Sequence, residues 1–412
     1  MRRPPLLALT PLVLALALTG CGGQRAGPLP TTLVLAYGVS SEETLTSDLQ
    51  DVLRQRMGEL ERVFQALHPG VRIRLQAIPE ERLAAKLQQQ QDSGLAPDLI
   101  NVNDSTAVQL HRRGLLRSLR FPRSVLAPLD PGMLRQLQLP GGDLLGLPLV
   151  LRPQLACYDR RRLETSPATL PALLSAASGG LRVGLSLEPR GLAWTSGATG
   201  ALPALTAAAA GRAPDAADRG RVRDWLTWLL AADLQQRVTF YANQEQLLRQ
   251  LADGSLDWIS CGSSNIMPLR RRLGDRLGLA PLPGGPGGAA SPTSLQRVLV
   301  FGRSSSPRQA QAAEILASFV VSPLIQRSIT LSSLDLLPAN RQVIPPAAES
   351  SPLAVLLAAQ AQADALPPDP WMARLLPEQE QRIKASLVAL LFGELDPAAA
   401  ADQVIATLRG GR

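Results

Sequence analysis

The sequence has 412 residues and a net charge of +8, with 45% apolar and 18% charged residues. A chain this long exceeds what one hydrophobic core normally supports, so two domains or lobes are expected. Arginine carries nearly all of the positive charge. The arginines are scattered, and no basic stripe alternates with aromatic residues. This distribution argues against a protein that binds nucleic acid.

The first thirty residues are typical of an export signal. Two arginines precede an apolar run over residues 6–18, which is shorter than the roughly 20 residues of a membrane-spanning helix and fits a signal peptide. The motif LTGC, which ends at Cys21, resembles the lipobox of bacterial lipoproteins, whose cysteine carries the membrane anchor. An ordinary signal peptide with an incidental Cys21 is the alternative. We expect a lipoprotein signal peptide over residues 1–20 and a lipidated tether over 21–30.

Strands and helices alternate along the first part of the mature chain. Ser40 and Ser41 are candidate N-caps of a long amphipathic helix, which Pro69-Gly70 ends. The expected elements are strand 32–37, this helix up to residue 67, strand 71–77, helix 80–91, strand 98–103 and helix 105–113. Such alternation predicts an α/β fold with a largely parallel sheet covered by helices on both faces.

A second set of elements begins near residue 147. The expected elements are strands 149–158, 181–187, 257–261 and 297–301, a Gly/Pro-rich loop 281–292, helices 307–321 and 323–331, and a helical tail from 351. Cys157 and Cys261 fall on two of these strands. In an exported protein they can form a disulfide or be two buried apolar residues, and the sequence leaves both open.

Several stretches, taken in order, resemble the extracellular solute-binding proteins of ABC importers, in the sugar-type family that includes maltose-binding protein. The stretches are FQALHPGV (64–71), APDLI (96–100) with Asn103-Asp104, GLL (114–116), LP (147–148) through YDR (158–160), LADG (251–254) through Gly262, LAPLPG (279–284), residues 310–326 and LPAN (337–340). Each motif is weak alone, but the ordered set covers most of residues 31–412.

The resemblance implies the type II periplasmic-binding-protein fold, in which two α/β lobes close on a ligand about a hinge. Residues 31–151 and 298–345 would form lobe one, and 152–297 and 346–412 would form lobe two. It further implies an exported monomer that faces the periplasm or cell exterior, captures a small solute and delivers it to ABC permease subunits.

Ligands of such sheets lie beyond the carboxyl ends of the strands. Asp104, after strand 98–103, is the best single candidate, because a carboxylate can accept hydrogen bonds from two sugar hydroxyls; its alternative role is to cap the next helix. Ser40 follows the first strand and is a further candidate. Glu188 and Arg190 resemble an acidic, proline-containing loop of the maltose-type proteins.

Five more positions complete the expected ligand site: Arg152, Trp194, Ser263, Ser264 and Asn265. Trp194 could stack on a sugar ring or be a core residue. Ser263, Ser264 and Asn265 end a strand and open a helix, where hydroxyl and N–H groups suit sugar or anion binding, or merely cap the helix. Arg152 stands where maltose-type proteins carry a carboxylate, and could bind the ligand or pair with Glu188.

The site departs from the family pattern at Ser264, where maltose-type proteins have a stacking tryptophan. With only 3% aromatic residues, a small sugar, glycoside or polyol is favoured over a long oligosaccharide. Arg152 and Arg190 keep an acidic or phosphorylated solute open.

Catalysis is not expected. The two histidines, His68 and His111, form no zinc motif, and the chain has no G-x-S-x-G elbow or P-loop. We expect no catalytic residue, metal or cofactor. An anchored glycoside hydrolase is the competing class, since a catalytic carboxylate pair has no sequence signature. A sensory receptor would use the same fold.

Overall fold

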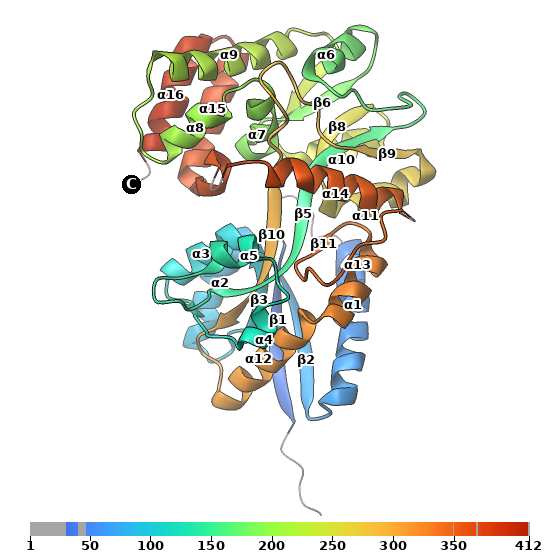
Figure 1. Cartoon of the computed structure of the whole chain (residues 1–412), viewed down its shortest axis with the longest axis vertical. Coiled ribbons are helices and arrows are strands. Elements are labelled where there is room, and N and C mark those ends of the chain that lie inside the picture. Colours follow the sequence, from blue (N-terminus) through green and yellow to red (C-terminus); the bar gives the residue numbers. More distant parts are fainter. Residues whose placement is uncertain (1–29, 40–46, 349, 368–369, 411–412) are drawn as a thin grey trace, which may run out of the picture.

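The computed structural model describes residues 30–39, 47–348, 350–367 and 370–410. Cys21, Ser40, the signal peptide and nearly all of the tether lie outside the described residues. Figure 1 shows two lobes stacked along the long axis of the molecule, with strands at the centre of each lobe and helices around them. The lobe that holds β1 is called lobe one, and the other is called lobe two.

Lobe one is built on the parallel strands β1, β2 and β3. In chain order its elements are β1 (Thr31–Val39), α1 (Ser47–Leu67), β2 (Val71–Pro79), α2 (Glu80–Asp92), β3 (Leu99–Asn103), α3 (Asp104–Arg112), β4 (Leu116–Arg117), α4 (Arg123–Leu126), α5 (Pro131–Leu137), α12 (Pro307–Val320), α13 (Pro323–Ser333) and β11 (Leu337–Pro338). Two long strands, β5 (Gly146–Asp159) and β10 (Ser294–Gly302), run between the lobes (Figure 1).

Lobe two contains most of the remaining helices. Its elements are α6 (Leu170–Ser178), β6 (Val183–Ser186), α7 (Pro189–Ala198), α8 (Leu202–Ala209), α9 (Ala216–Asp233), β7 (Val238–Tyr241), α10 (Gln244–Ala252), β8 (Trp258–Gly262), η1 (Ser263–Asn265), α11 (Ile266–Leu273), η2 (Gly274–Arg276), β9 (Leu277–Ala280), α14 (Ser351–Asp364), η3 (Trp371–Arg374), α15 (Pro377–Leu391) and α16 (Pro397–Arg409). The exact residue limits of the lobes stay a prediction.

One connected sheet passes through both lobes in the order β2-β1-β3-β10-β5-β8-β6-β7. β1 pairs in parallel with β2 and β3, and β6 pairs in parallel with β7 and β8. The crossing strands are antiparallel: β10 to β3 and β5, and β5 to β8 and β9. The expected α/β architecture of two lobes is confirmed, and each lobe combines parallel strands with an antiparallel crossing strand.

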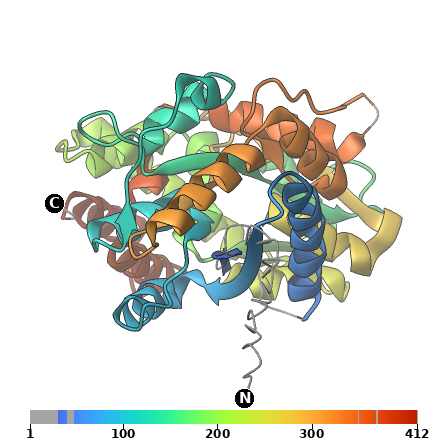
Figure 2. The ribbon, with the colours of Figure 1, turned by 90° about the horizontal axis from the view of Figure 1, so that it is seen from below.

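Helices cover both faces of the lobe-one strands. On one face α1 and α12 pack over the strands (Figure 2). The rings of Phe64 on α1 and Phe319 on α12 meet there, with centroids 5.3 Å apart. On the other face Leu83 and Leu87 of α2 and Leu110 of α3 fill a second core. Leu99 of β3 lies in the first core, and Ile100 and Val102 lie in the second, so this strand buries apolar side chains on both faces.

The largest core lies in lobe two and holds all five tryptophans, four of them fully buried and Trp228 partly buried at its margin. The rings of Trp225 and Trp371 lie 6.1 Å apart. Several helices begin after a side chain that accepts a backbone N–H and is followed by proline, as at Asp130, Ser306 and Asp396. This combination of N-cap and N1 proline fixes where those helices start.

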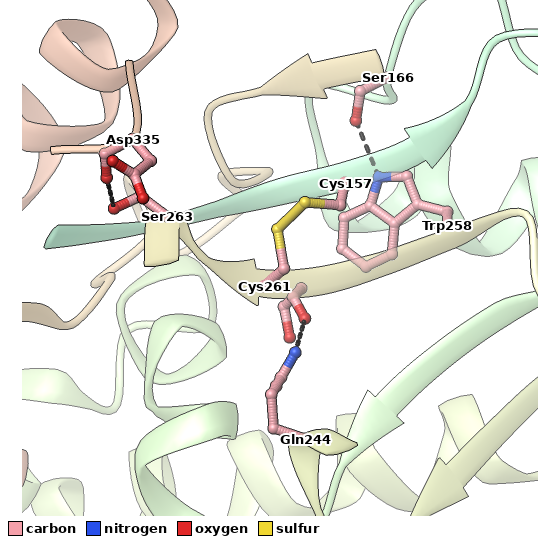
Figure 3. Close-up of a disulfide and its surroundings, with 8 residues drawn as sticks. Cys157, Ser166, Gln244, Trp258, Cys261, Ser263 and Asp335 are labelled. Carbon is pink, nitrogen blue, oxygen red and sulfur yellow. Dashed lines mark hydrogen bonds between the residues drawn. A yellow bond between two sulfur atoms is a disulfide. The ribbon is translucent and has the colours of Figure 1, made fainter. Parts of the chain in front are cut away.

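The structure contains a disulfide between Cys157 and Cys261, whose Cα atoms lie 5.9 Å apart (Figure 3). Cys157 is on β5 and Cys261 on the neighbouring antiparallel β8, and both are fully buried. Of the two alternatives left open by the sequence, the structure therefore shows the bonded one.

Within the described ranges no single helix is long and apolar enough to cross a membrane, although the bent pair α12 and α13, at 63°, meets a test of length and composition.

Candidate functional site

The lobe-one side of the candidate site lies at the carboxyl ends of β1 and β3, where α2 and α3 begin. Glu80 opens α2, directly after β2, and Asp104 opens α3, directly after β3. Gly38 on β1 leaves room for the Glu80 side chain, because a Cβ at Gly38 would stand 2.8 Å from Glu80 Cγ. The chain thus gathers two carboxyl groups at one edge of the lobe-one sheet, as the position of ligand sites in such sheets predicts.

A buried arginine on the crossing strand β10 holds this edge together. The Arg297 side chain is 1% exposed, and its Nη1 lies 2.7 Å from Glu80 Oε1. Arg297 also donates to Asn101 Oδ1 (2.9 Å), Asn103 Oδ1 (3.2 Å), the carbonyl of Gly38 (2.7 Å) and the carbonyl of Asn101 (2.8 Å). Its guanidinium lies 4.7 Å from the centre of the Tyr37 ring. Every arm of this guanidinium is used, so Arg297 acts as a rigid support for the carboxyl ends of β1 and β3.

Glu80 is the counterpart of this arginine and connects the two helix starts. Its Oε1 also accepts the Asn103 N–H (3.1 Å), and its Oε2 accepts the Thr106 hydroxyl. The Glu80 carboxylate therefore stabilises the first turn of α3, where Asp104 stands.

Asp104 is half-buried and accepts the Ser105 N–H at 2.7 Å. Burial raises the pKa of Asp104 above its ordinary 3.8; the Ser105 N–H and the charge of Arg190 act in the opposite direction, and Glu80 adds to the rise. Asp104 belongs to lobe one and Arg190 to lobe two. The expected candidates Asp104 and Arg190 therefore lie near enough to interact between the lobes.

The lobe-two side of the site lies at the carboxyl end of β6. Glu188 follows this strand, and its N–H donates to Ser186 Oγ (3.1 Å). Burial raises the pKa of Glu188, and Lys384 and the backbone N–H of Gln244 partly counteract this rise. Glu188 thus has partners on its own lobe, and among the described residues the ion pair with Arg152 considered above is not formed.

Arg190, in the first turn of α7, is held by the C-terminal helices. Its Nε lies 3.4 Å from Glu380 Oε2 on α15, and its Nη2 donates to the carbonyl of Leu375 at 3.1 Å. Arg152 on β5 is 9% exposed and donates from Nη2 to the Tyr37 hydroxyl at 3.3 Å. Arg152 therefore belongs to the crossing region between the lobes, near the base of the site.

Trp194 is a core residue and not a stacking surface. It is 0% exposed and its ring lies 6.0 Å from that of Trp258. The expectation that Trp194 contacts a sugar ring is corrected by this burial: helix α7 turns this position towards the core of lobe two, while Arg190, one helical turn earlier, remains partly exposed.

Ser263, Ser264 and Asn265 form the turn η1 between β8 and α11, as expected from the sequence. Ser263 is fully buried and donates from Oγ to the carbonyl of Asp335 at 2.6 Å (Figure 3), and Asn265 is 4% exposed. Ser264 is half-buried. The Ser263 hydroxyl thus links η1 to the segment before β11, which leaves Ser264 the most accessible of the three.

Sequence reasoning missed Glu80, Arg297 and Tyr37. The available signal was a charged residue at the head of an apolar run, Arg297-Val-Leu-Val-Phe301, which a strand buried on both faces tolerates only with partners. Over the described part of the chain, no group of three or more His, Cys, Asp or Glu side chains is arranged to hold a metal ion.

A family model described as bacterial extracellular solute-binding protein matches residues 62–355. The chain belongs to this family. The expected resemblance is thereby confirmed, and membership of a family of extracellular binding proteins agrees with the expectation that the chain is not an enzyme. A comparison with curated proteins finds no match.

Solved structures share the fold of this solute-binding protein at low identity. The GacH receptor of Streptomyces glaucescens, solved unliganded and with acarbose, has a TM-score of 0.71 and 17% identity over 93% of this chain and 100% of its own. A Thermotoga lettingae solute-binding protein bound with α-D-tagatose has a TM-score of 0.70 and 15% identity, covering 92% and 99%. Maltose-bound MalE3 of T. maritima has a TM-score of 0.70 and 17% identity, also covering 92% and 99%.

Proposed function

We propose that this solute-binding protein captures a small sugar, glycoside or polyol between its lobes and delivers it to an ABC permease. The observation that carries the proposal is the pair of carboxyl groups, Asp104 and Glu188, at the carboxyl-end edges of the two lobes. Burial raises the pKa of each, because each has lost part of the hydration that stabilises a carboxylate in water. Sugar hydroxyls supply such donors, and Arg190 supplies a donor to sugar oxygens.

Two carboxylates at this boundary disfavour an anionic ligand, because the ligand would bring a further negative charge next to them. The solved structures of similar fold support a carbohydrate, since their ligands are acarbose, tagatose and maltose. Burial of four of the five tryptophans favours a small ligand, as stacking on long oligosaccharides needs exposed rings.

We further propose that Cys21 carries a lipid and that residues 21–30 tether the protein to the membrane. Residues 31–151 and 298–345 would form lobe one, and residues 152–297 and 346–412 would form lobe two. The protein would act as a monomer facing the periplasm or cell exterior, and ligand would select the closed form that the permease subunits bind. The test of the anchor is Cys21→Ser, which should move the full-length protein from the membrane fraction to the soluble fraction of its host.

The ligand is tested by thermal unfolding of the chain from residue 22 onward against monosaccharides, disaccharides, glycosides, polyols and sugar phosphates. A ligand at about 100 times its dissociation constant adds roughly 2.7 kcal/mol of stability, an easily measured shift. Asp104→Ala should abolish the shift. Asp92→Ala, an exposed carboxylate at the end of α2 in the same lobe, is the matched control and should retain it.

The panel also separates the alternatives. A shift only with acidic or phosphorylated solutes would transfer the ligand contacts to Arg152 and Arg190 and reject a neutral sugar. No shift with any member of the panel would reject the carbohydrate proposal and leave the family assignment unchanged.

A further inference from the structure

Lobe two carries a cluster of arginines at the end of its sheet that lies away from Glu188. Asp159 ends β5, Arg182 precedes β6, Asp257 precedes β8, and Arg276 precedes β9. The Arg160 N–H donates to the carbonyl of Arg276 at 2.8 Å, which joins the segment after β5 to the segment after α11. We call the surface formed by eight arginines the basic flank: Arg160, Arg161, Arg162, Arg182, Arg270, Arg271, Arg272 and Arg276. In Figure 1, α11 and β9 lie on the right-hand side of lobe two.

Two buried carboxylates fix four of these guanidinium groups. Asp159, with 2% of its side chain exposed, lies 2.9 Å from Arg161 Nη2 and 2.6 Å from Arg276 Nη2. Asp257, 1% exposed, lies 2.6 Å from Arg182 Nη2 and 3.6 Å from Arg162 Nε. The Arg161 and Arg162 side chains are still 58% and 57% exposed. The carboxylates therefore hold the arginines in place while the outer N–H groups stay accessible to solvent.

The remaining four arginines are exposed. Arg270, Arg271 and Arg272 lie in the last turn of α11, where positive charge also stabilises the helix end. Acidic residues nearby do not neutralise this positive charge. The segments 159–164, 182, 257 and 270–276 contain eight arginines but only four acidic residues, Asp159, Glu164, Asp257 and Asp275. The basic flank keeps a net charge of +4, half of the charge of the whole chain.

We propose that the basic flank docks a linear polymer of phosphate groups that carries no bases. Guanidinium forks held in fixed positions match phosphate oxygens geometrically, and eight arginines on one flank favour a partner with repeated negative charge. A protein partner is disfavoured because protein interfaces are anchored by apolar and aromatic residues, and none of the large exposed apolar side chains among the described residues belongs to the flank.

Nucleic acid is disfavoured by composition. The segments 159–164 and 270–276 contain no aromatic residue on which a base could stack. The flank also lies at the opposite ends of β6 and β8 from Glu188 and Ser263, so polymer and solute would bind independently of each other.

The test measures binding of fluorescently labelled inorganic polyphosphate to the chain from residue 22 onward, by anisotropy, over a range of salt concentrations. The variant combines Arg270→Gln, Arg271→Gln and Arg272→Gln. Within the described part of the chain these three side chains form no ion pair, so Asp159 and Asp257 keep their arginine partners. The control combines Arg72→Gln, Arg74→Gln and Arg82→Gln, three exposed arginines of lobe one that remove the same charge. Circular dichroism establishes that both variants fold.

The flank variant should weaken polyphosphate binding at least tenfold, against less than twofold for the control. The slope of log K against log salt should fall by about two when three phosphate contacts are lost. Equal losses in the two variants would overturn the proposal, because net charge alone would explain the binding. Equal or tighter binding of polyglutamate, or tighter binding of oligo-dT at matched charge, would also overturn it in favour of an acidic protein or a nucleic acid.

Discussion

The buried pair of Arg297 and Glu80 gives the sharpest test of how this fold is held together. Replacing Arg297 with Met removes five hydrogen bonds and leaves the Glu80 carboxylate, together with the Gly38 and Asn101 carbonyls, without their partner. Breaking one member of a buried ion pair costs about 3–5 kcal/mol, since the other charge stays buried and unpaired. We expect Arg297→Met to lower the free energy of unfolding by an amount in this range.

The distribution of tryptophans makes the effect measurable lobe by lobe. All five tryptophans pack in the lobe-two core, so their fluorescence reports lobe two, whereas far-ultraviolet circular dichroism reports the helices of both lobes. Because two-lobed proteins need not unfold in one step, the urea transition is followed by both signals. Arg297→Met should shift the circular-dichroism transition to lower urea by more than the fluorescence transition.

Two companion variants isolate the charge. Adding Glu80→Gln to Arg297→Met should restore part of the lost stability, because the unpaired charge is removed. Arg249→Met breaks the exposed pair with Glu245, at 3.3 Å on α10, and should cost only about 0.3–0.5 kcal/mol. A loss below about 1 kcal/mol for Arg297→Met would refute the assignment of Arg297 as a structural support.

Three further predictions follow from charges and the disulfide. Burial raises the pKa of Asp104, so the folded chain binds its proton more tightly than the unfolded chain, and stability falls as pH rises from 3.8 through the raised value. Asp104→Asn should therefore raise the melting temperature at pH 7 and abolish the shift that ligand produces. A lower melting temperature would contradict this reasoning. Burial alone would raise the pKa of Asp159 and Asp257, but hydrogen bonds from arginines outweigh burial and lower both values. The stability that these carboxylates contribute is therefore complete above pH 3.8 and is lost as pH falls below it. Asp257→Asn should make stability depend less on pH in this acidic range, and an unchanged pH dependence would argue against the pairing. Cys157→Ala with Cys261→Ala removes a cross-link across 104 residues and should lower the free energy of unfolding by about 2–5 kcal/mol. Dithiothreitol should likewise lower the melting temperature of the parent chain. A parent chain that does not respond to dithiothreitol, together with a double variant of unchanged stability, would exclude the bond.

Local patterns of the sequence predicted the elements well. The stop at Pro69-Gly70 matches the end of α1 at Leu67, and strand 98–103 is observed as β3, Leu99–Asn103. Strand 149–158 is longer in the structure, as β5 from Gly146 to Asp159, because pairing with β10 in one lobe and with β8 and β9 in the other extends it. The additional ladder partners are distant in sequence and leave no local signal.

The candidate site was harder to predict because its alternatives are decided by tertiary packing. Trp194 suited either a ligand surface or a core, and its neighbour Trp258 is 64 residues away in the chain. Arg297 finds its partners on β1, β3 and α2, so the sequence near position 297 contains none of them. The pairing of Cys157 with Cys261 likewise depends on β5 and β8 being neighbours.

If ligand binds between Asp104 and Arg190, as we propose, the hydrogen-bond partners of these two residues determine what drives the two lobes to close. Arg190 is held on its own lobe by Glu380 and the Leu375 carbonyl, and Asp104 already accepts the Ser105 N–H. A direct bridge between Asp104 and Arg190 would therefore compete with existing bonds and gain little. A ligand whose hydroxyls donate to Asp104 and accept from the free N–H groups of Arg190 keeps those bonds and adds new ones in both lobes. The closing energy would then come mainly from the ligand, which makes the closed form dependent on its presence.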